Sequence, residues 1–290
     1  MLFGAHVSSS GGISNAIDRA ETLGCDAVQV FTQSPRMWRP TTHSREQVER
    51  FRTRCAEAKI GSVVCHALYL VNLASPDKEI HSKSVAAMRS SLEAAQAIGA
   101  EGVVFHVGSH LGAGFAAARK RVVPAMRALL ELTSESLWLL MENSAGAGGT
   151  IGRSTDELAE IFDALDRHPR LGVCLDSCHW WVSGVDVTSP DALDEALAQV
   201  DDRFGLDRIR CLHVNDAQAD LGSNRDRHAS IGDGELGDGL AVFLAHPAFQ
   251  PLPAILETPG PEGHGPDRLE LERLRGLHRR GRRRRPKRWR

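Results

Sequence analysis

LGVCLDSCH, at residues 171–179, contains the pattern that decides the fold. It begins as a short apolar run and ends that run on a carboxylate, Asp176. Short apolar runs bounded by polar residues are typical of strands that are buried on both faces of a parallel sheet. The 290-residue chain contains seven further runs of this kind, and each is followed by a stretch with helical spacing.

The alternation of strands and helices predicts one closed barrel. The predicted strands are residues 2–6, 26–31, 62–66, 102–106, 137–142, 171–176, 209–213 and 253–257. The predicted helices are residues 13–23, 45–58, 80–98, 115–132, 156–165, 190–203, 240–245 and 267–277. Cap signals support several of them: STDE at 154–157, TSPD at 188–191, and glycine at 24 and 99. We predict a single-domain (β/α)8 TIM barrel over residues 1–277, rather than a doubly wound sheet with a second domain.

The composition of the chain indicates its cellular location and the state of its cysteines. The first ten residues lack a basic stretch followed by an apolar run, and no apolar run approaches the roughly 20 residues of a membrane span. We therefore expect a cytoplasmic, monomeric protein without a membrane partner. The six cysteines show no CxxC spacing, so we expect reduced thiols. Cys178 stands beside His179, but a buried core cysteine is the more common role.

Charge is distributed unevenly along the chain. Residues 278–290 carry nine Lys or Arg and no acid, and removing these nine charges from the net −2 leaves about −11 on the rest. We predict that this basic tail is disordered and solvated. The alternative is an arm that binds phosphates without sequence preference.

Side chains of the types that bind metals fall at one position of the predicted barrel. Six strands end on such a residue: His66, His106, Glu142, Asp176, His213 and Glu257. In a (β/α)8 barrel the carboxyl ends of all strands open onto one face, where active sites lie. Six such groups would repel one another there without cations, so we predict that they converge on metal ions.

Two local spacings extend the predicted site. His179 follows Asp176 by three residues, which is about one helical turn, and Asp226 and His228 are two apart, which aligns them in an extended loop. The total of nine ligands indicates three ions, with Glu142 bridging a pair. Because the ligands offer only nitrogen and oxygen, zinc is the leading ion and manganese the alternative.

Charge then indicates the substrate. Three dications would bring about +6 against four carboxylates, which leaves about +2 in the mouth of an otherwise acidic protein. A phosphodiester fits such a site, because paired ions can activate water and stabilise the leaving oxygen of an in-line displacement.

Eight ordered segments resemble the motifs of the endonuclease IV family of apurinic/apyrimidinic endonucleases. They are GAHVS at 4–8, CHALYLVNL at 65–73, FHVGSH at 105–110, ENSAG at 142–146, LDSCH at 175–179, LHVNDA at 212–217, DRHASIGDG at 226–234 and LETP at 256–259. The resemblance spans residue 1 to about 277. It implies a zinc enzyme of base excision repair that cuts double-stranded DNA 5′ to an abasic site, leaves a 3′-hydroxyl, and trims blocked 3′ ends.

The resemblance also implies roles for individual residues. One ion would be held by His66, His106 and Glu142, a second by Glu142, Asp176, His213 and Glu257, and a third by His179, Asp226 and His228. Glu142 and Glu257 would serve in catalysis. His6 and His110 lie in the motifs without being family ligands, and we interpret both as hydrogen-bonding core residues.

The loop QSPRMW at 33–38 resembles the family segment that enters the DNA. A protein that recognises a missing base can insert side chains into the stack and flip the sugar into a pocket too small for a base. Arg36, Met37, Tyr69 and Leu70 match positions used in this way. Met37 departs from the glutamine of well-known bacterial members, and the basic tail has no family role.

Two alternatives remain open at this point. A divalent-metal sugar isomerase or epimerase uses the same scaffold, but typically with fewer ions and fewer histidines. The set His179, Asp226 and His228 and the loop at 33–38 favour the nuclease. A lesion-binding protein without activity is the other alternative, and the intact set of nine ligands argues against it.

Overall fold

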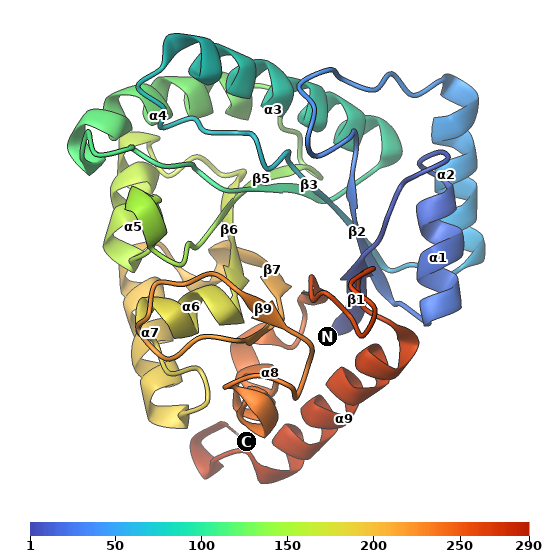
Figure 1. The fold of residues 1–290 in the computed structure, drawn as a ribbon, viewed down its shortest axis with the longest axis vertical. Helices are drawn as coiled ribbons and strands as arrows, with labels where there is room; N and C mark the ends of the chain where they lie inside the picture. Colours follow the sequence, from blue (N-terminus) through green and yellow to red (C-terminus); the bar gives the residue numbers. More distant parts are fainter. Residues whose placement is uncertain (290) are drawn as a thin grey trace.

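The computed structural model describes residues 1–289. Eight strands form one closed barrel in the order β1-β10-β7-β6-β5-β4-β3-β2, and neighbouring strands are parallel throughout. The strands lie at the centre of Figure 1, and the helices surround them. The predicted single (β/α)8 barrel is confirmed.

The barrel strands agree closely with the sequence prediction. They are β1 Leu2–His6, β2 Ala27–Phe31, β3 Ser62–His66, β4 Gly102–Phe105, β5 Trp138–Glu142, β6 Leu171–Asp176, β7 Ile209–His213 and β10 Pro253–Leu256. No end differs from its predicted position by more than one residue, because the apolar runs are short and their polar boundaries are sharp. β1 and β2 approach closely at Gly4, where a Cβ atom would lie 2.0 Å from the carbonyl oxygen of Ala27.

The helices form the outer layer. They are α1 Asn15–Leu23, α2 Arg45–Glu57, α3 Lys78–Ile98, α4 Phe115–Leu130, α5 Thr155–Ala164, α6 Ser177–Ser183, α7 Pro190–Arg203, α8 Leu240–Ala245 and α9 Arg268–Arg284. Short 3-10 turns lie at η1 Ala147–Gly149, η2 Leu206–Arg208, η3 Gly237–Gly239, η4 Pro247–Phe249 and η5 Lys287–Trp289. Ser154 and Ser189 cap α5 and α7, and Gly24 and Gly99 end α1 and α3 in the left-handed conformation, as the cap signals predict.

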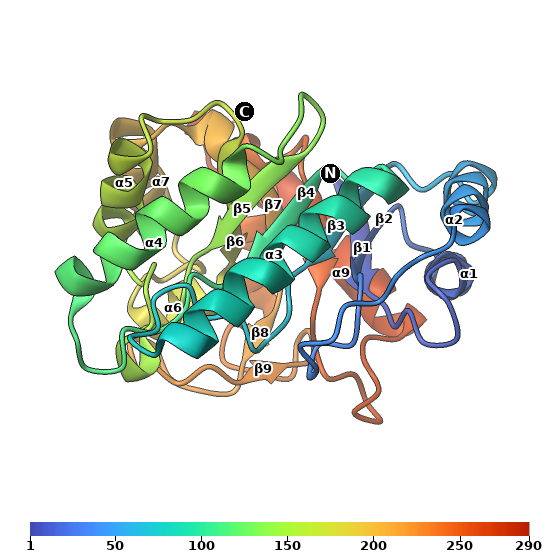
Figure 2. The same cartoon turned by 90° about the horizontal axis from the view of Figure 1, so that it is seen from above.

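One helix and two short strands near the mouth were not predicted as such. α6 begins directly after β6, because the side chain of Asp176 caps it by accepting a hydrogen bond from the backbone N–H of His179. β8 (Asp216–Ala217) and β9 (His228–Ala229) form a small antiparallel pair. In Figure 2 this pair lies at the bottom of the view, beneath the ends of the barrel strands.

The basic tail differs from its prediction. α9 continues to Arg284, and Gly281 packs so closely that a Cβ atom would lie 2.0 Å from the carbonyl oxygen of Ala241. Trp289 is buried and donates a hydrogen bond to Asp194 in α7, and Arg288 contacts the same carboxylate. The expectation of disorder is therefore wrong for residues 278–289, because carboxylates of α7 and the buried indole hold this segment in place.

Period-2 alternation along the strands builds the barrel interior. One buried apolar layer contains Ala27, Val64, Val104, Leu140, Cys174, Cys211 and Ile255. The residue two positions after each of these points the same way, one level closer to the mouth. In six of the seven cases that residue is one of the predicted ligands. The alternation along the strands therefore places these six ligands at the same height in the barrel.

Candidate metal centre

The polar level at the mouth of the barrel receives one side chain from each strand or from the residue that follows it. Its members are His6, Gln29, His66, His106, Glu142, Asp176, His213 and Glu257. Most of them are buried. The sequence predicted six of these residues as ligands at the mouth and His6 as a hydrogen-bonding core residue, and Gln29 was missed.

The first group of candidate ligands joins β3, β5 and the end of β4. Glu142 Oε2 lies 3.2 Å from Nε2 of His66 and 3.6 Å from Nε2 of His106. His66 Nδ1 lies 2.7 Å from the carbonyl oxygen of Ala67. Nδ1 carries the hydrogen and donates it to this carbonyl, so the lone pair of Nε2 faces the site.

The second group meets the first at Glu142. The other carboxylate oxygen, Oε1, lies 3.0 Å from Nδ1 of His213, which is also 3.1 Å from Oε2 of Glu257. Asp176 completes this group, and Asn215 donates a hydrogen bond of 2.6 Å to its Oδ2. Glu142 thus faces two groups with its two oxygens, as a bridging carboxylate would.

The third group comes from α6 and the β8–β9 region. Asp226 Oδ2 lies 3.3 Å from Nε2 of His179, and its Oδ1 lies 3.4 Å from Nε2 of His228. The first turn of α6 brings His179 back toward Asp176, and β9 positions His228. All nine residues predicted as ligands therefore lie in three adjoining groups, and within each group the candidate ligand atoms lie within 4.8 Å of one another.

Two buried nitrogens test whether these residues fit metal ions. Nε2 of His179 and Nε2 of His228 are buried and lack a hydrogen-bond partner within the described residues. A buried polar atom without a partner is costly, and both atoms point at the carboxylate of Asp226. The buried clusters of His, Glu and Asp fit a multi-metal site, because cations would satisfy these atoms and offset the carboxylate charges.

Protonation in the metal-free chain supports the same conclusion. Burial would raise the pKa of Glu142, but the charges of His106 and His213 outweigh it and hold that pKa well below its ordinary value. Burial would likewise raise the pKa of Asp226, yet the imidazole of His179, 3.3 Å away, lowers that pKa to about 2. Although burial lowers it, the pKa of His213 rises to about 10 because Glu257 and Glu142 face the ring. Protons on imidazoles thus occupy positions that metal ions would take.

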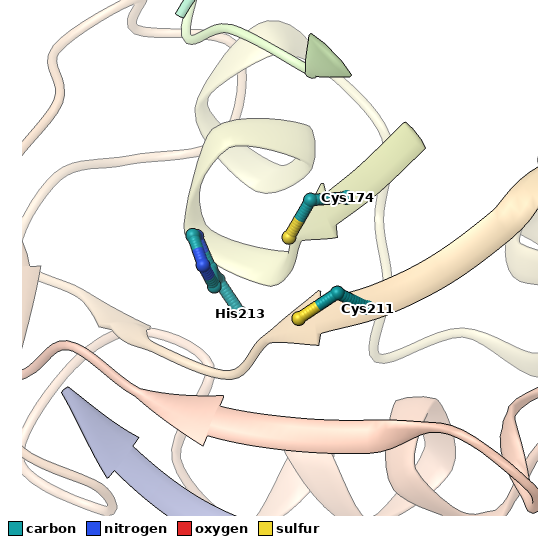
Figure 3. Close-up of side chains that lie close together, drawn as sticks. All are labelled: Cys174, Cys211 and His213. Carbon is teal, nitrogen blue, oxygen red and sulfur yellow. The ribbon is translucent and has the colours of Figure 1, made fainter. Parts of the chain in front are cut away.

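A cysteine pair lies directly below the second group. Cys174 and Cys211 are paired in register on β6 and β7, and Figure 3 shows both sulfurs near the ring of His213. Both side chains belong to the apolar layer of the interior, and burial raises the pKa of the Cys174 thiol well above its ordinary value. We interpret the pair as neutral core thiols. Cys178 is also buried, with its pKa raised by burial, as expected of a core residue.

The other two motif histidines belong to none of the ligand groups, but both make hydrogen bonds near the mouth. His6 Nδ1 lies 3.1 Å from Oε1 of Glu257, the oxygen that faces away from His213. His110 Nδ1 accepts hydrogen bonds from the backbone N–H groups of Gly112 and Gly114. Both contacts agree with the predicted hydrogen bonding, but both side chains are half-buried rather than in the core.

Two of the residues predicted to contact DNA, Arg36 and Tyr69, line a hollow beside the ligand groups. A cavity of about 850 Å³ is lined by Arg36, Tyr69, Phe31 and His6, among others. The ring of Tyr69 packs edge-on against Phe31 at 5.1 Å and is nevertheless 60 % exposed. Met37 is exposed on the same loop as Arg36, and Leu70 is half-buried beside Tyr69. The hollow therefore presents the cation of Arg36 and the exposed ring of Tyr69.

The sequence and the fold are similar to those of known proteins. The family described as xylose isomerase-like TIM barrel matches residues 17–277. A probable endonuclease 4 of Methanoculleus marisnigri is 42% identical over 261 residues, which cover 89% of this chain and 93% of that protein. The crystal structure of endonuclease IV from Thermus thermophilus superposes with a TM-score of 0.84 at 35% identity, covering 97% of this chain and all of that one. A D-tagatose 3-epimerase-like protein superposes at 0.73 with 17% identity, and covers 97% of both chains.

The barrel and the clustered ligands at its mouth define a TIM-barrel metalloenzyme. The chain belongs to the endonuclease IV family, AP endonuclease family 2, and so to the DNA-repair nucleases that are built on this barrel. The likeness to the epimerase-like protein concerns the fold alone. No helix in the described part of the chain has the length and apolar character needed to cross a bilayer.

Proposed function

We propose that this protein hydrolyses the phosphodiester 5′ to an abasic site in double-stranded DNA, leaves a 3′-hydroxyl, and also removes blocked 3′ ends. The observation that carries this proposal is the position of Glu142 between two of the three ligand groups, with one oxygen toward each. Adjoining metal sites that share a carboxylate suit an in-line displacement at phosphorus. We propose Zn²⁺ for all three sites, with Mn²⁺ as an alternative at one or more of them.

The assignment of ligands follows the three groups. His66, His106 and Glu142 would hold one ion. Glu142, Asp176, His213 and Glu257 would hold a second, and His179, Asp226 and His228 a third. When bound, the ions lower the pKa of water and stabilise the negative charge that develops on the phosphate.

The residues of the chain orient these groups and the substrate. Asn215 fixes Asp176 by donating to Oδ2 and also accepts from the backbone N–H of Glu257, so one amide ties two ligands together. Arg36 and Tyr69 line the hollow beside the clusters, where a flipped sugar could lie. We assign lesion recognition to Arg36 and Tyr69, together with Met37 and Leu70 on the rim.

Incision of a defined duplex tests this function. The substrate carries a single tetrahydrofuran abasic analogue, and the matched duplex carries a normal base at that position. We expect one cut 5′ to the analogue with a 3′-hydroxyl product, loss of cutting after prolonged chelation, and recovery when Zn²⁺ is returned. If the zinc-loaded protein leaves the abasic strand uncut, or cuts no better than Glu142→Gln, the proposed function is wrong.

A further inference from the structure

Gln29 is the member of the polar level that is neither a predicted ligand nor a motif histidine. It lies in the middle of β2 and has no exposed surface. Its Nε2 donates a hydrogen bond of 2.5 Å to Oε1 of Glu257 and lies 2.9 Å from Nδ1 of His6. Its Oε1 lies 2.8 Å from Nε2 of His213. One amide thus contacts two residues of the second ligand group from behind.

The chemistry of these atoms fixes the orientation of the amide. An ionised carboxylate accepts hydrogen bonds and donates none, so the NH₂ end of Gln29 must face Glu257. The carbonyl end of Gln29 then faces His213. Because a carbonyl oxygen can only accept, Nε2 of His213 must carry the hydrogen between them.

The tautomer of His213 follows from this chain of contacts. A neutral imidazole with its hydrogen on Nε2 has its lone pair on Nδ1. Nδ1 lies 3.0 Å from Oε1 of Glu142 and 3.1 Å from Oε2 of Glu257. Three lone-pair atoms therefore converge on one point, an arrangement that only a cation or a proton satisfies.

Gln29 also selects between the two oxygens of Glu257. Its amide and the ring of His6 both contact Oε1, and Oε2 is the oxygen that faces His213. Hydrogen bonds to one oxygen hold a carboxylate in one rotamer and leave the other oxygen available. The same glutamine therefore leaves Nδ1 of His213 and Oε2 of Glu257 free to bind a common ion.

We propose that Gln29 is a positioning residue of the second metal site, which sets the tautomer of His213 and the rotamer of Glu257. The inference rests on the proposed function only in that it assumes a metal ion between these two ligands. A glutamine that merely fills space would act on neither the tautomer nor the metal affinity.

Gln29→Met and Gln250→Met form a matched pair of variants. Methionine has a similar volume and excludes water but lacks the amide. Gln250 makes the same kind of contact at a remote place, since its Oε1 accepts from Nε2 of His278 at 2.8 Å. We expect Gln29→Met to weaken the affinity for Zn²⁺, measured by competition with a chromophoric chelator, by about 10- to 100-fold at one site. Gln250→Met should stay within about twofold of the wild type on the same principle.

Nitrogen-15 NMR of the zinc-loaded protein reads the tautomer directly. In the wild type and in Gln250→Met we expect the hydrogen of the His213 ring on Nε2, and in Gln29→Met a loss of that single tautomer.

Gln29→Ala is the second variant, used if Gln29→Met does not fold, because water can enter and restore part of the contact. Wild-type zinc affinity together with an unchanged His213 tautomer in the folded Gln29 variants would overturn the inference. Failure of the wild type to cut abasic DNA would instead overturn the proposed function, because neither zinc measurement depends on cutting.

Discussion

Oε2 of Glu142 lies 3.2 Å from Nε2 of His66, although 76 positions separate the two residues in the chain. They meet because β3 and β5 flank β4 in the barrel and each ends with its last side chain pointing inward. The second oxygen of Glu142 faces His213 in the same way. Glu142 is therefore the residue through which a change at one ligand group reaches the other.

Glu142→Gln should abolish most of the incision activity. The substitution keeps the size of the side chain but removes its charge and turns one oxygen into a donor, which cannot face a cation. We expect incision of the abasic duplex to fall by more than about 100-fold, since changes behind the ligands alone cost about 10- to 100-fold. The control is Glu101→Gln, because Glu101 precedes β4 at the opposite end of the barrel and accepts from Ser62. Equal loss in both variants would mean that Glu142 acts through folding alone.

Removal of metal should lower the stability of the fold. The buried carboxylates of Glu142 and Asp176 and the unpaired nitrogens of His179 and His228 lie together, and cations offset both. A ligand that binds only the folded state adds about 2.7 kcal/mol at 100 times its Kd. Thermal unfolding of the chelated protein should therefore occur at a lower temperature, and added Zn²⁺ should restore it. A midpoint that does not respond to Zn²⁺ would contradict a buried multi-metal site.

Much of the site could be predicted from the sequence because strand alternation is rigid. Once Val64, Val104 and Leu140 are assigned to one interior layer, His66, His106 and Glu142 must lie on the next level. Gln29 was missed because a single glutamine inside AVQVF reads as an interruption of an apolar run, and its partners are distant in sequence. Its signal was the register: Gln29 follows Ala27 by two, as His66 follows Val64.

The tail was mispredicted for a different physical reason. A run of nine positive charges is normally solvated, and composition cannot show that Asp191 and Asp194 of α7 lie opposite Arg288. The apolar side chain of Trp289, a single residue at the end of the run, gave the only sign of packing. Tertiary partners from another part of the chain decide such a segment.

Tyr69→Ala should weaken recognition of the lesion more than cutting of a bound substrate. The exposed ring at the rim can stack on nucleotides, and loss of one stacking platform costs about 1–3 kcal/mol. We expect the Kd for the abasic duplex to rise by about 5- to 150-fold, whereas Tyr69→Phe, which keeps the ring, should remain close to the wild type. Fluorescence anisotropy with the abasic duplex and the intact duplex measures both. Equal effects of the two variants would assign the role to the hydroxyl group instead.

Trp289→Ala should destabilise the barrel without slowing incision per folded molecule. The indole is buried against α7 and α8, and removing a buried tryptophan costs about 3 kcal/mol. Leu269→Ala is the control, because Leu269 lies on α9 with 69% of its surface exposed and should change little. Urea unfolding measures the difference. A tail that contributes nothing to stability would give the same midpoint in both variants.

Asp194→Asn should destabilise the fold near neutral pH but not in acid. Burial would raise the pKa of Asp194, but hydrogen bonds from Arg288 and Trp289 outweigh it and lower that pKa. A carboxyl whose pKa is lower in the folded state stabilises the fold above its unfolded pKa, and this contribution disappears as the pH falls through the folded value. We therefore expect the free energy of unfolding of the wild type to exceed that of Asp194→Asn by about 1 kcal/mol between pH 5 and 7, and the difference to close below about pH 4.

Metal-free protein is used at every pH, so that acid release of zinc cannot imitate the effect. Asp191→Asn is the matched control: the same Arg288 contacts Asp191, but that side chain is far more exposed and should contribute less. A gap between wild type and Asp194→Asn that stays constant down to pH 3 would mean that packing, not the charge of Asp194, holds the tail.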